Sequence, residues 1–175
     1  MPIQRKICTA TLNQLNVYYD SFKGMRVKVT KIKGKGMGVV SQEDINKGVV
    51  IAYYRTNKIS NKKLSGKYKC ENYTIYASQR SVGVMDSSLL FGTFRNIPYV
   101  GAYLNEPAYV NDVNCAVSEP LDVPNTNFVD YKFTTTRYIK KGEELCWCYG
   151  PDYTGRNYKT ECEGKDPIVQ KNVNE

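Results

Sequence analysis

The chain has 175 residues, of which 41% are hydrophobic, with no histidine and a formal net charge of +8. This length and composition suffice for one globular domain with a hydrophobic core and exclude a disordered chain. The absence of histidine excludes Ser-His and Cys-His nucleophile pairs, so an enzyme must use tyrosine, carboxylates, lysine, cysteine, backbone groups or a cofactor. The positive charge favours acidic partners such as nucleic acid, and lysine-rich usage from an AT-rich genome explains it equally well.

No apolar run reaches the ~20 residues needed to span a bilayer, and residues 1–4 show no signal peptide. We therefore expect a protein without membrane contact, located in the nucleus or cytoplasm, of a host cell if the chain is viral. The six cysteines are expected to be reduced thiols, because their spacing does not resemble that of a small secreted scaffold. A zinc site at Cys146 and Cys148 would need two further ligands nearby, so we expect no metal.

The first third of the chain predicts a short helix followed by strands. A helix is expected within residues 9–19, which have partial helical spacing of apolar residues. Residues 25–32 alternate apolar and basic, which predicts a half-exposed strand with lysines on its outer face. The glycine-rich residues 33–38 then predict a hairpin leading into a strand at Val39. A phosphate-binding loop is disfavoured, because such a loop would open a helix.

The rest of the chain shows short apolar runs separated by turn residues. Residues 57–69 are polar and basic, which predicts an exposed insert. Strands are expected at residues 49–54, 73–77, 82–86, 112–117, 128–133 and 134–139, and residues 99–104 form a further apolar run. This pattern, without a long amphipathic helix, predicts a mostly β domain of small sheets.

Residues 145–149, Leu-Cys-Trp-Cys-Tyr, are uncharged and lie between a charged turn and Gly150-Pro151. This pattern predicts a strand buried on both faces, which ends where proline can no longer donate to a ladder. Tyr149, at the exit of such a strand, could hold its hydroxyl in a cavity while packing fixes its ring. A core strand that simply closes with a turn is the alternative.

Several landmarks, in a fixed order along the chain, carry a resemblance to a known family: Gly36-Met37-Gly38, Met85-Asp86, Tyr103-Leu104-Asn105, Asn114-Cys115, Gly142-Glu143-Glu144-Leu145 and Tyr149-Gly150. Together they resemble the SET-domain protein-lysine methyltransferases, over residues 25–153. The resemblance implies a SET fold of small β-sheets with a knot-like C-terminal threading and few short helices. It leaves residues 1–24 as an N-terminal flank and residues 154–175 as a segment that closes the active site or forms a tail.

The resemblance also implies a function, the transfer of a methyl group from S-adenosylmethionine to a lysine of a protein such as a histone or nucleosome. Tyr149 matches the catalytic tyrosine, and Tyr73 is the choice for the second channel tyrosine, with Tyr76 as its competitor. Trp147 and Tyr153 are expected in the substrate channel, with Tyr158 as a further wall. The expected cofactor-binding residues are Lys35, Gly36, Met37, Gly38, Tyr103, Asn105, Glu106 and Tyr149.

The sequence departs from the family pattern at two of these positions. Glu106 stands where the family has histidine, and it could replace the backbone contacts of that histidine or pair with a lysine or arginine on the surface. Trp147 stands where the family has a phenylalanine or tyrosine that affects how many methyl groups are added, and it could restrict the channel or face the core. Tyr153 could line the channel or pack against the last strand.

A second function is compatible with the same sequence. A catalytically silent SET-like module could bind chromatin or nucleic acid non-specifically through its basic surface, as the net charge of +8 and the altered motif at Glu106 suggest. A β-rich structural protein without a cofactor is a third interpretation. The methylation state of the product and the oligomeric state stay open.

Overall fold

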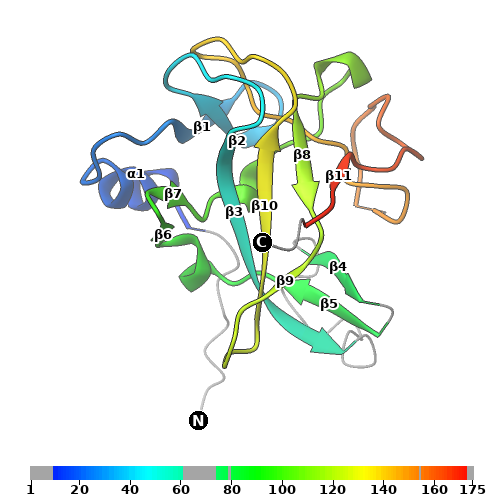
Figure 1. The fold of residues 1–175 in the computed structure, drawn as a ribbon. Coiled ribbons are helices and arrows are strands. Elements are labelled where there is room, and N and C mark those ends of the chain that lie inside the picture. The colour runs from blue at the N-terminus through cyan, green and yellow to red at the C-terminus, as the bar shows by residue number, and fades with distance from the viewer. Residues whose placement is uncertain (1–9, 61–73, 79, 154, 173–175) are drawn as a thin grey trace.

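Short strands dominate the computed structural model, which describes residues 10–60, 74–78, 80–153 and 155–172 (Figure 1). Over these ranges the elements in chain order are α1 (Leu12–Tyr19), β1 (Val27–Ile32), β2 (Gly36–Ser41), β3 (Val50–Ser60), β4 (Thr74–Ser78), β5 (Ser81–Val84), η3 (Ser87–Leu90), β6 (Thr93–Phe94), β7 (Ile97–Pro98), η4 (Gly101–Tyr103), η5 (Val110–Asp112), β8 (Cys115–Ser118), β9 (Leu121–Asp122), β10 (Phe128–Thr135) and β11 (Val169–Gln170). The mostly β prediction is confirmed.

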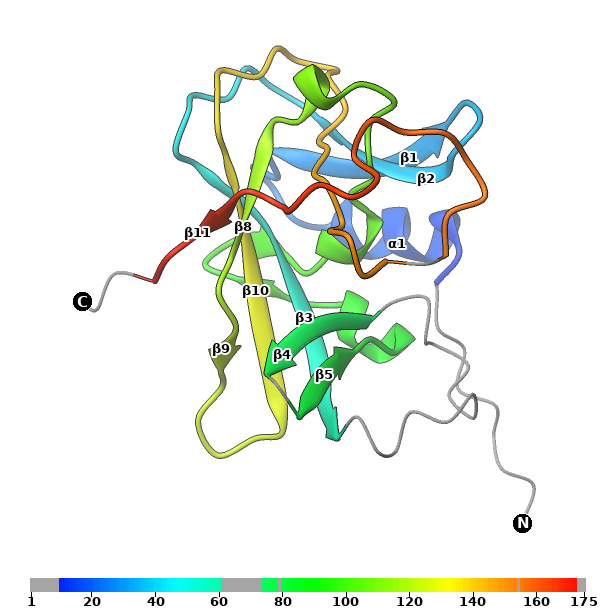
Figure 2. The ribbon, with the colours of Figure 1, turned by 90° about the vertical axis from the view of Figure 1, so that its right-hand side faces the viewer.

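One larger sheet forms the frame of the molecule. Its strands follow the order β11-β8-β10-β3-β5-β4, with β9 paired beside β10. The long strands β3 and β10 run antiparallel through its centre, and the β4-β5 hairpin extends it at one end (Figures 1 and 2). The β1-β2 hairpin lies across the opposite end, and β6-β7 forms a separate small ladder.

The N-terminal part of the described chain behaves as its sequence predicts. Thr11 caps α1 by accepting a hydrogen bond from the Gln14 N–H, and the Gln14 side chain accepts in return from the Thr11 N–H. The helix packs against β1, whose Val27 and Val29 are buried while Lys28 between them is exposed. None of the helices in the described ranges is long and apolar enough to cross a membrane.

Two predicted boundaries are wrong. Strand β3 runs on to Ser60, so the expected exposed insert begins inside a paired strand, and residues 61–69 of that insert lie outside the described part. The two strands expected at 128–133 and 134–139 are one strand, β10, that ends at Thr135. The strand continues through Thr134 and Thr135 because these buried residues still pair with β8. The local sequence could not indicate this distant partner strand.

Residues 145–149 are not a regular strand, although Leu145 to Cys148 are buried as predicted. The backbone of this segment changes partner at successive residues. The Leu145 N–H donates to Val39 at 2.8 Å, the Trp147 N–H donates to Asn105 at 3.1 Å, and the Cys146 carbonyl accepts from β8. The segment is therefore threaded between three parts of the chain, which precludes one continuous ladder. The knot-like character of this threading stays a prediction.

The expectation of reduced cysteines is wrong for two of the six. Cys148 and Cys162 form a disulfide with their Cα atoms 5.2 Å apart. The chain after Gly150 folds back on the 145–149 segment, which brings together two thiols that are 14 residues apart in sequence. Cys115 and Cys146 are free and buried, and Cys8 and Cys70 lie outside the described residues.

Candidate active site

The glycine hairpin, the turn at Asn105 and the acidic turn before Leu145 meet at one place. The Asn105 side-chain amide donates to the Met37 carbonyl and to a Glu144 carboxylate oxygen, each at 3.0 Å. The Lys35 ammonium lies 3.0 Å from the other carboxylate oxygen of Glu144. The structure thus brings together three predicted site residues from segments more than 30 residues apart, with Glu144, which was not among the predicted site residues.

Gly38 is the residue that permits this approach. A Cβ atom at Gly38 would lie 2.6 Å from Ile32 Cγ1, 2.7 Å from Asn105 Nδ2 and 3.1 Å from Glu144 Oε1. Real Cβ atoms essentially never approach another heavy atom within 3.0 Å, so a larger residue would displace the Ile32 and Asn105 side chains. Gly36, two residues earlier, has a φ of +82°, which L residues rarely adopt.

Tyr149 is held at its ring, its hydroxyl and its backbone. Its ring centroid lies 5.3 Å from that of Trp147 and 4.9 Å from that of Tyr153, both edge to face. Its hydroxyl donates to the Leu104 carbonyl at 3.0 Å, and its N–H donates to Glu106 Oε1 at 2.6 Å. Burial raises the pKa of Tyr149 well above its usual value, so the phenol remains protonated at neutral pH and acts as a hydrogen-bond donor.

Trp147 packs against the core and against Tyr149 at once. Its side chain is buried, and its ring centroid lies 5.0 Å from that of Phe133 on β10. Its indole N–H is buried and has no hydrogen-bond partner among the described residues. Tyr153 packs on Tyr149 and is half-exposed, and its place in a substrate channel stays a prediction.

Glu106 pairs with an arginine, as one of the two alternatives predicted, but the pair lies in the interior, so its expected surface location is wrong. Its side chain is fully buried, and its carboxylate pairs with Arg156 at 2.7 Å. The Tyr158 hydroxyl donates to the same carboxylate at 2.9 Å. Sequence reasoning missed Arg156, because it lies 50 residues from Glu106 in a polar segment without a motif.

The SET-domain family model matches residues 36–150, which is more than half of the chain. The chain belongs to the SET-domain family. No match was found among curated proteins. A solved structure from Plasmodium falciparum, provisionally described as a histone methyltransferase, is similar at a TM-score of 0.47 and 18% identity, covering 69% of this chain and 90% of that one.

Three further tyrosines are candidates for the site, namely Tyr73, Tyr76 and Tyr103. The Tyr103 oxygen is 3.3 Å from the Ala10 nitrogen, so this ring reaches toward the N-terminal flank. Tyr73 lies outside the described residues. Its competitor Tyr76 is on β4 with 64% of its surface exposed. The roles of these tyrosines stay predictions.

The residues around Gly38 fit S-adenosylmethionine, which SET methyltransferases generally use. The amino-acid end of this cofactor carries a carboxylate and an ammonium, and Lys35 and Glu144 offer the complementary charges beside the Asn105 amide. A Cβ atom built at Gly36 would meet no atom within 4 Å, so there is space for a ligand beside this backbone. No group of three or more histidine, cysteine or acidic residues that could hold a metal occurs in the described ranges.

Proposed function

We propose that the chain is an S-adenosylmethionine-dependent protein-lysine methyltransferase, with a histone lysine as the first substrate to test. The observation that carries this proposal is the set of contacts around Tyr149. Its protonated hydroxyl donates to the Leu104 carbonyl, and its ring packs edge to face on two other aromatic rings. The hairpin at Gly38 and the side-chain amide of Asn105 both form hydrogen bonds with the segment that leads to Tyr149. Membership of the SET family supports the reaction class.

Methyl transfer to lysine requires the neutral amine. A free lysine has a pKa of about 10.4, so removing its proton at pH 7 costs about 4–5 kcal/mol. Removal of water in a channel walled by residues such as Trp147 and Tyr153, and the positive sulfur of the bound cofactor, would disfavour the charged ammonium and lower this pKa. The proton can then leave to solvent without a histidine base, which agrees with the composition of the chain.

The chain's own groups act by orientation. When bound, S-adenosylmethionine supplies an electrophilic methyl group on a positively charged sulfur. The Tyr149 hydroxyl and the Leu104 carbonyl, fixed to each other at 3.0 Å, are a donor and an acceptor of defined direction beside the proposed channel. Alignment of two reactants can contribute roughly 7–11 kcal/mol toward lowering a barrier. Lys35, the Gly36–Gly38 backbone, Asn105 and Glu144 would hold the cofactor.

The direct test is incubation of the purified chain with radiolabelled S-adenosylmethionine and core histones, with a cell lysate as a second substrate source. We expect label in a discrete protein band, and mass spectrometry should place it on a lysine. Calorimetry with S-adenosylmethionine should show binding. Absence of both labelling and cofactor binding would rule out the proposed activity.

The silent, nucleic-acid-binding module is favoured by one surface feature. Lys28 and Lys31 are exposed on β1, and Lys33 continues this basic edge into the following turn. Such a surface would bind DNA with an affinity that falls steeply as salt rises. DNA binding at moderate salt without cofactor binding would favour this function.

A further inference from the structure

Each oxygen of the buried Glu106 carboxylate accepts two hydrogen bonds. Oε1 accepts from the Tyr149 N–H at 2.6 Å and from Arg156 Nη2 at 2.7 Å. Oε2 accepts from Arg156 Nε at 2.8 Å and from the Tyr158 hydroxyl at 2.9 Å. One side chain therefore joins the backbone of Tyr149 to two residues of the C-terminal segment.

Arg156 extends this connection along the chain that follows Tyr149. Its guanidinium also donates to the Gly150 carbonyl at 3.0 Å and to the Tyr153 carbonyl. It lies 5.1 Å from the centroid of the Tyr153 ring, which itself packs on the Tyr149 ring. Arg156 thus fixes both the turn that leaves Tyr149 and the aromatic wall beside it.

The C-terminal segment returns along the residues that follow Glu106. Thr160 donates its hydroxyl to the Pro107 carbonyl at 2.6 Å, and the Glu161 N–H donates to the Ala108 carbonyl at 2.9 Å. The Cys148–Cys162 disulfide closes the same loop. The described residues of this segment, 150–153 and 155–162, are therefore tied to Tyr149 and to residues 106–108, with the Glu106–Arg156 pair as their buried link.

A buried ion pair is poor evidence for stability, because desolvation of both charges offsets much of their attraction. The presence of this ion pair is better explained by the backbone arrangement that it fixes. Here that geometry belongs to Tyr149, since the carboxylate accepts the amide of this residue and the guanidinium binds the next carbonyl. A charge-assisted hydrogen bond of 2.6 Å restricts the backbone more tightly than a neutral one.

We propose that Glu106 and Arg156 are positioning residues, which hold the Tyr149 backbone, Tyr153 and Tyr158 in the arrangement that methyl transfer requires. This inference rests on the proposed function. It also assigns Glu106 a role through its carboxylate, apart from any backbone contact that it makes to the cofactor.

Two variants test this role. Arg156→Lys keeps the positive charge but loses the two parallel hydrogen bonds, and Glu106→Gln keeps the shape but loses the negative charge. Displacement of a reacting group by about 1 Å can cost about 100-fold in rate, and we expect kcat to fall by about this factor in each variant. Calorimetry should show a dissociation constant for S-adenosylmethionine close to that of the unaltered chain.

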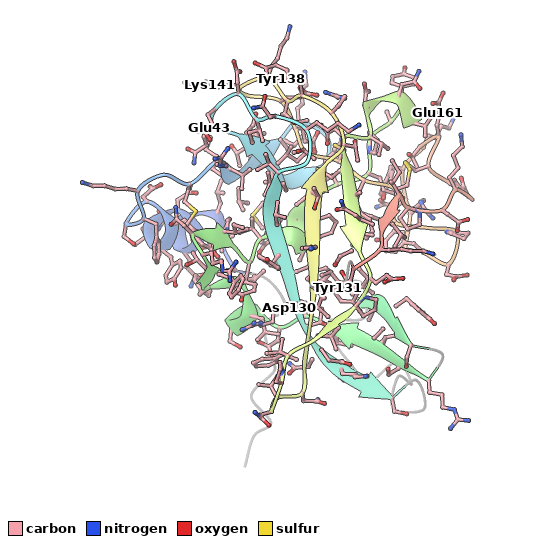
Figure 3. The ribbon with its side chains drawn as sticks, in the orientation of Figure 1. Glu43, Asp130, Tyr131, Tyr138, Lys141 and Glu161 are labelled. Atoms are coloured by element: carbon pink, nitrogen blue, oxygen red, sulfur yellow. A yellow bond between two sulfur atoms is a disulfide. The ribbon has the colours of Figure 1, made fainter. Side chains whose placement is uncertain are left out.

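Arg55→Lys is the matched control. Arg55 makes the same two parallel bonds to Asp130, both at 2.8 Å, between β3 and β10. Asp130 lies on β10 well away from Glu161 of the C-terminal segment (Figure 3). We expect this control to retain kcat. A kcat for Arg156→Lys equal to that of Arg55→Lys would overturn the proposal.

An activity-independent measurement separates this proposal from the proposed function. The Tyr149 amide proton, hydrogen-bonded to a carboxylate, should resonate far downfield in the NMR spectrum and move upfield in Glu106→Gln. In Arg156→Lys its hydrogen exchange should become faster while the amides of β3 keep theirs. If the unaltered chain transfers no methyl group, the proposed function fails. Independently, the positioning role would be overturned if the Tyr149 amide kept its resonance in Glu106→Gln and its exchange rate in Arg156→Lys.

Discussion

Replacement of Tyr149 by phenylalanine isolates one hydroxyl in the candidate active site. Phenylalanine keeps the ring contacts with Trp147 and Tyr153, and the backbone N–H still donates to Glu106. What is lost is the donor that lies 3.0 Å from the Leu104 carbonyl. We expect Tyr149→Phe to lose methyl transfer while it still binds S-adenosylmethionine.

The magnitudes separate the effect on folding from the effect on catalysis. Removal of the hydroxyl leaves the Leu104 carbonyl without this donor, which costs about 1–3 kcal/mol of stability. A domain of this size typically has about 5–15 kcal/mol of stability, so the variant should remain folded. Loss of a preorganised donor at a reacting centre typically lowers kcat by about 10²–10³, or about 2.7–4 kcal/mol. The fall in kcat should therefore greatly exceed any fall in the folded fraction.

The assay compares initial rates of label transfer with cofactor binding by calorimetry and melting by circular dichroism. Tyr19→Phe is the control, because the Tyr19 hydroxyl also lies at hydrogen-bond distance from backbone carbonyls, those of Leu90 and Gly92 on the N-terminal side of the fold. It should lose a similar amount of stability and keep its turnover. Turnover of Tyr149→Phe at the level of Tyr19→Phe would refute the role of the hydroxyl.

Three further outcomes follow from the structure. Reduction of the Cys148–Cys162 bridge, which spans 14 residues, should lower the free energy of unfolding by about 3 kcal/mol, and the double alanine variant should melt at the same temperature with or without reductant. Gly38→Ala should weaken S-adenosylmethionine binding and destabilise the fold by about 1–3 kcal/mol. Gly34→Ala is the control, because a methyl group at Gly34 meets no atom within 4 Å. It should cost only the strain of the φ of +78° and leave calorimetric binding unchanged. Burial raises the pKa of Tyr131, so above pH ~10 the unfolded chain loses this proton first and stability should fall as pH rises. Urea titrations at pH 9 to 11 should show a shallower fall for Tyr131→Phe, and an equally steep one would argue against this assignment.

Local patterns along the sequence predicted much of the fold. Alternation of valine and lysine in β1 indicated one buried face, and the period of two is a property of any strand. The close approach at Gly38 was signalled by alternate glycines, since only a missing side chain lets backbone lie against a neighbouring turn. Tyr149 was identified at the end of a buried run, and the order of motifs indicated the SET family, which the family model confirmed.

Only the tertiary structure decided how distant segments meet. The bond between Cys148 and Cys162, the pairing of Glu106 with Arg156 and the change of partner within residues 145–149 all depend on where the chain returns after Gly150. No local propensity encodes such a return, because it is selected by the free energy of the whole packed arrangement. The sequence by itself thus determined the family and predicted which residues carry the chemistry, whereas the threading of the C-terminal segment decided which distant residues hold them in place.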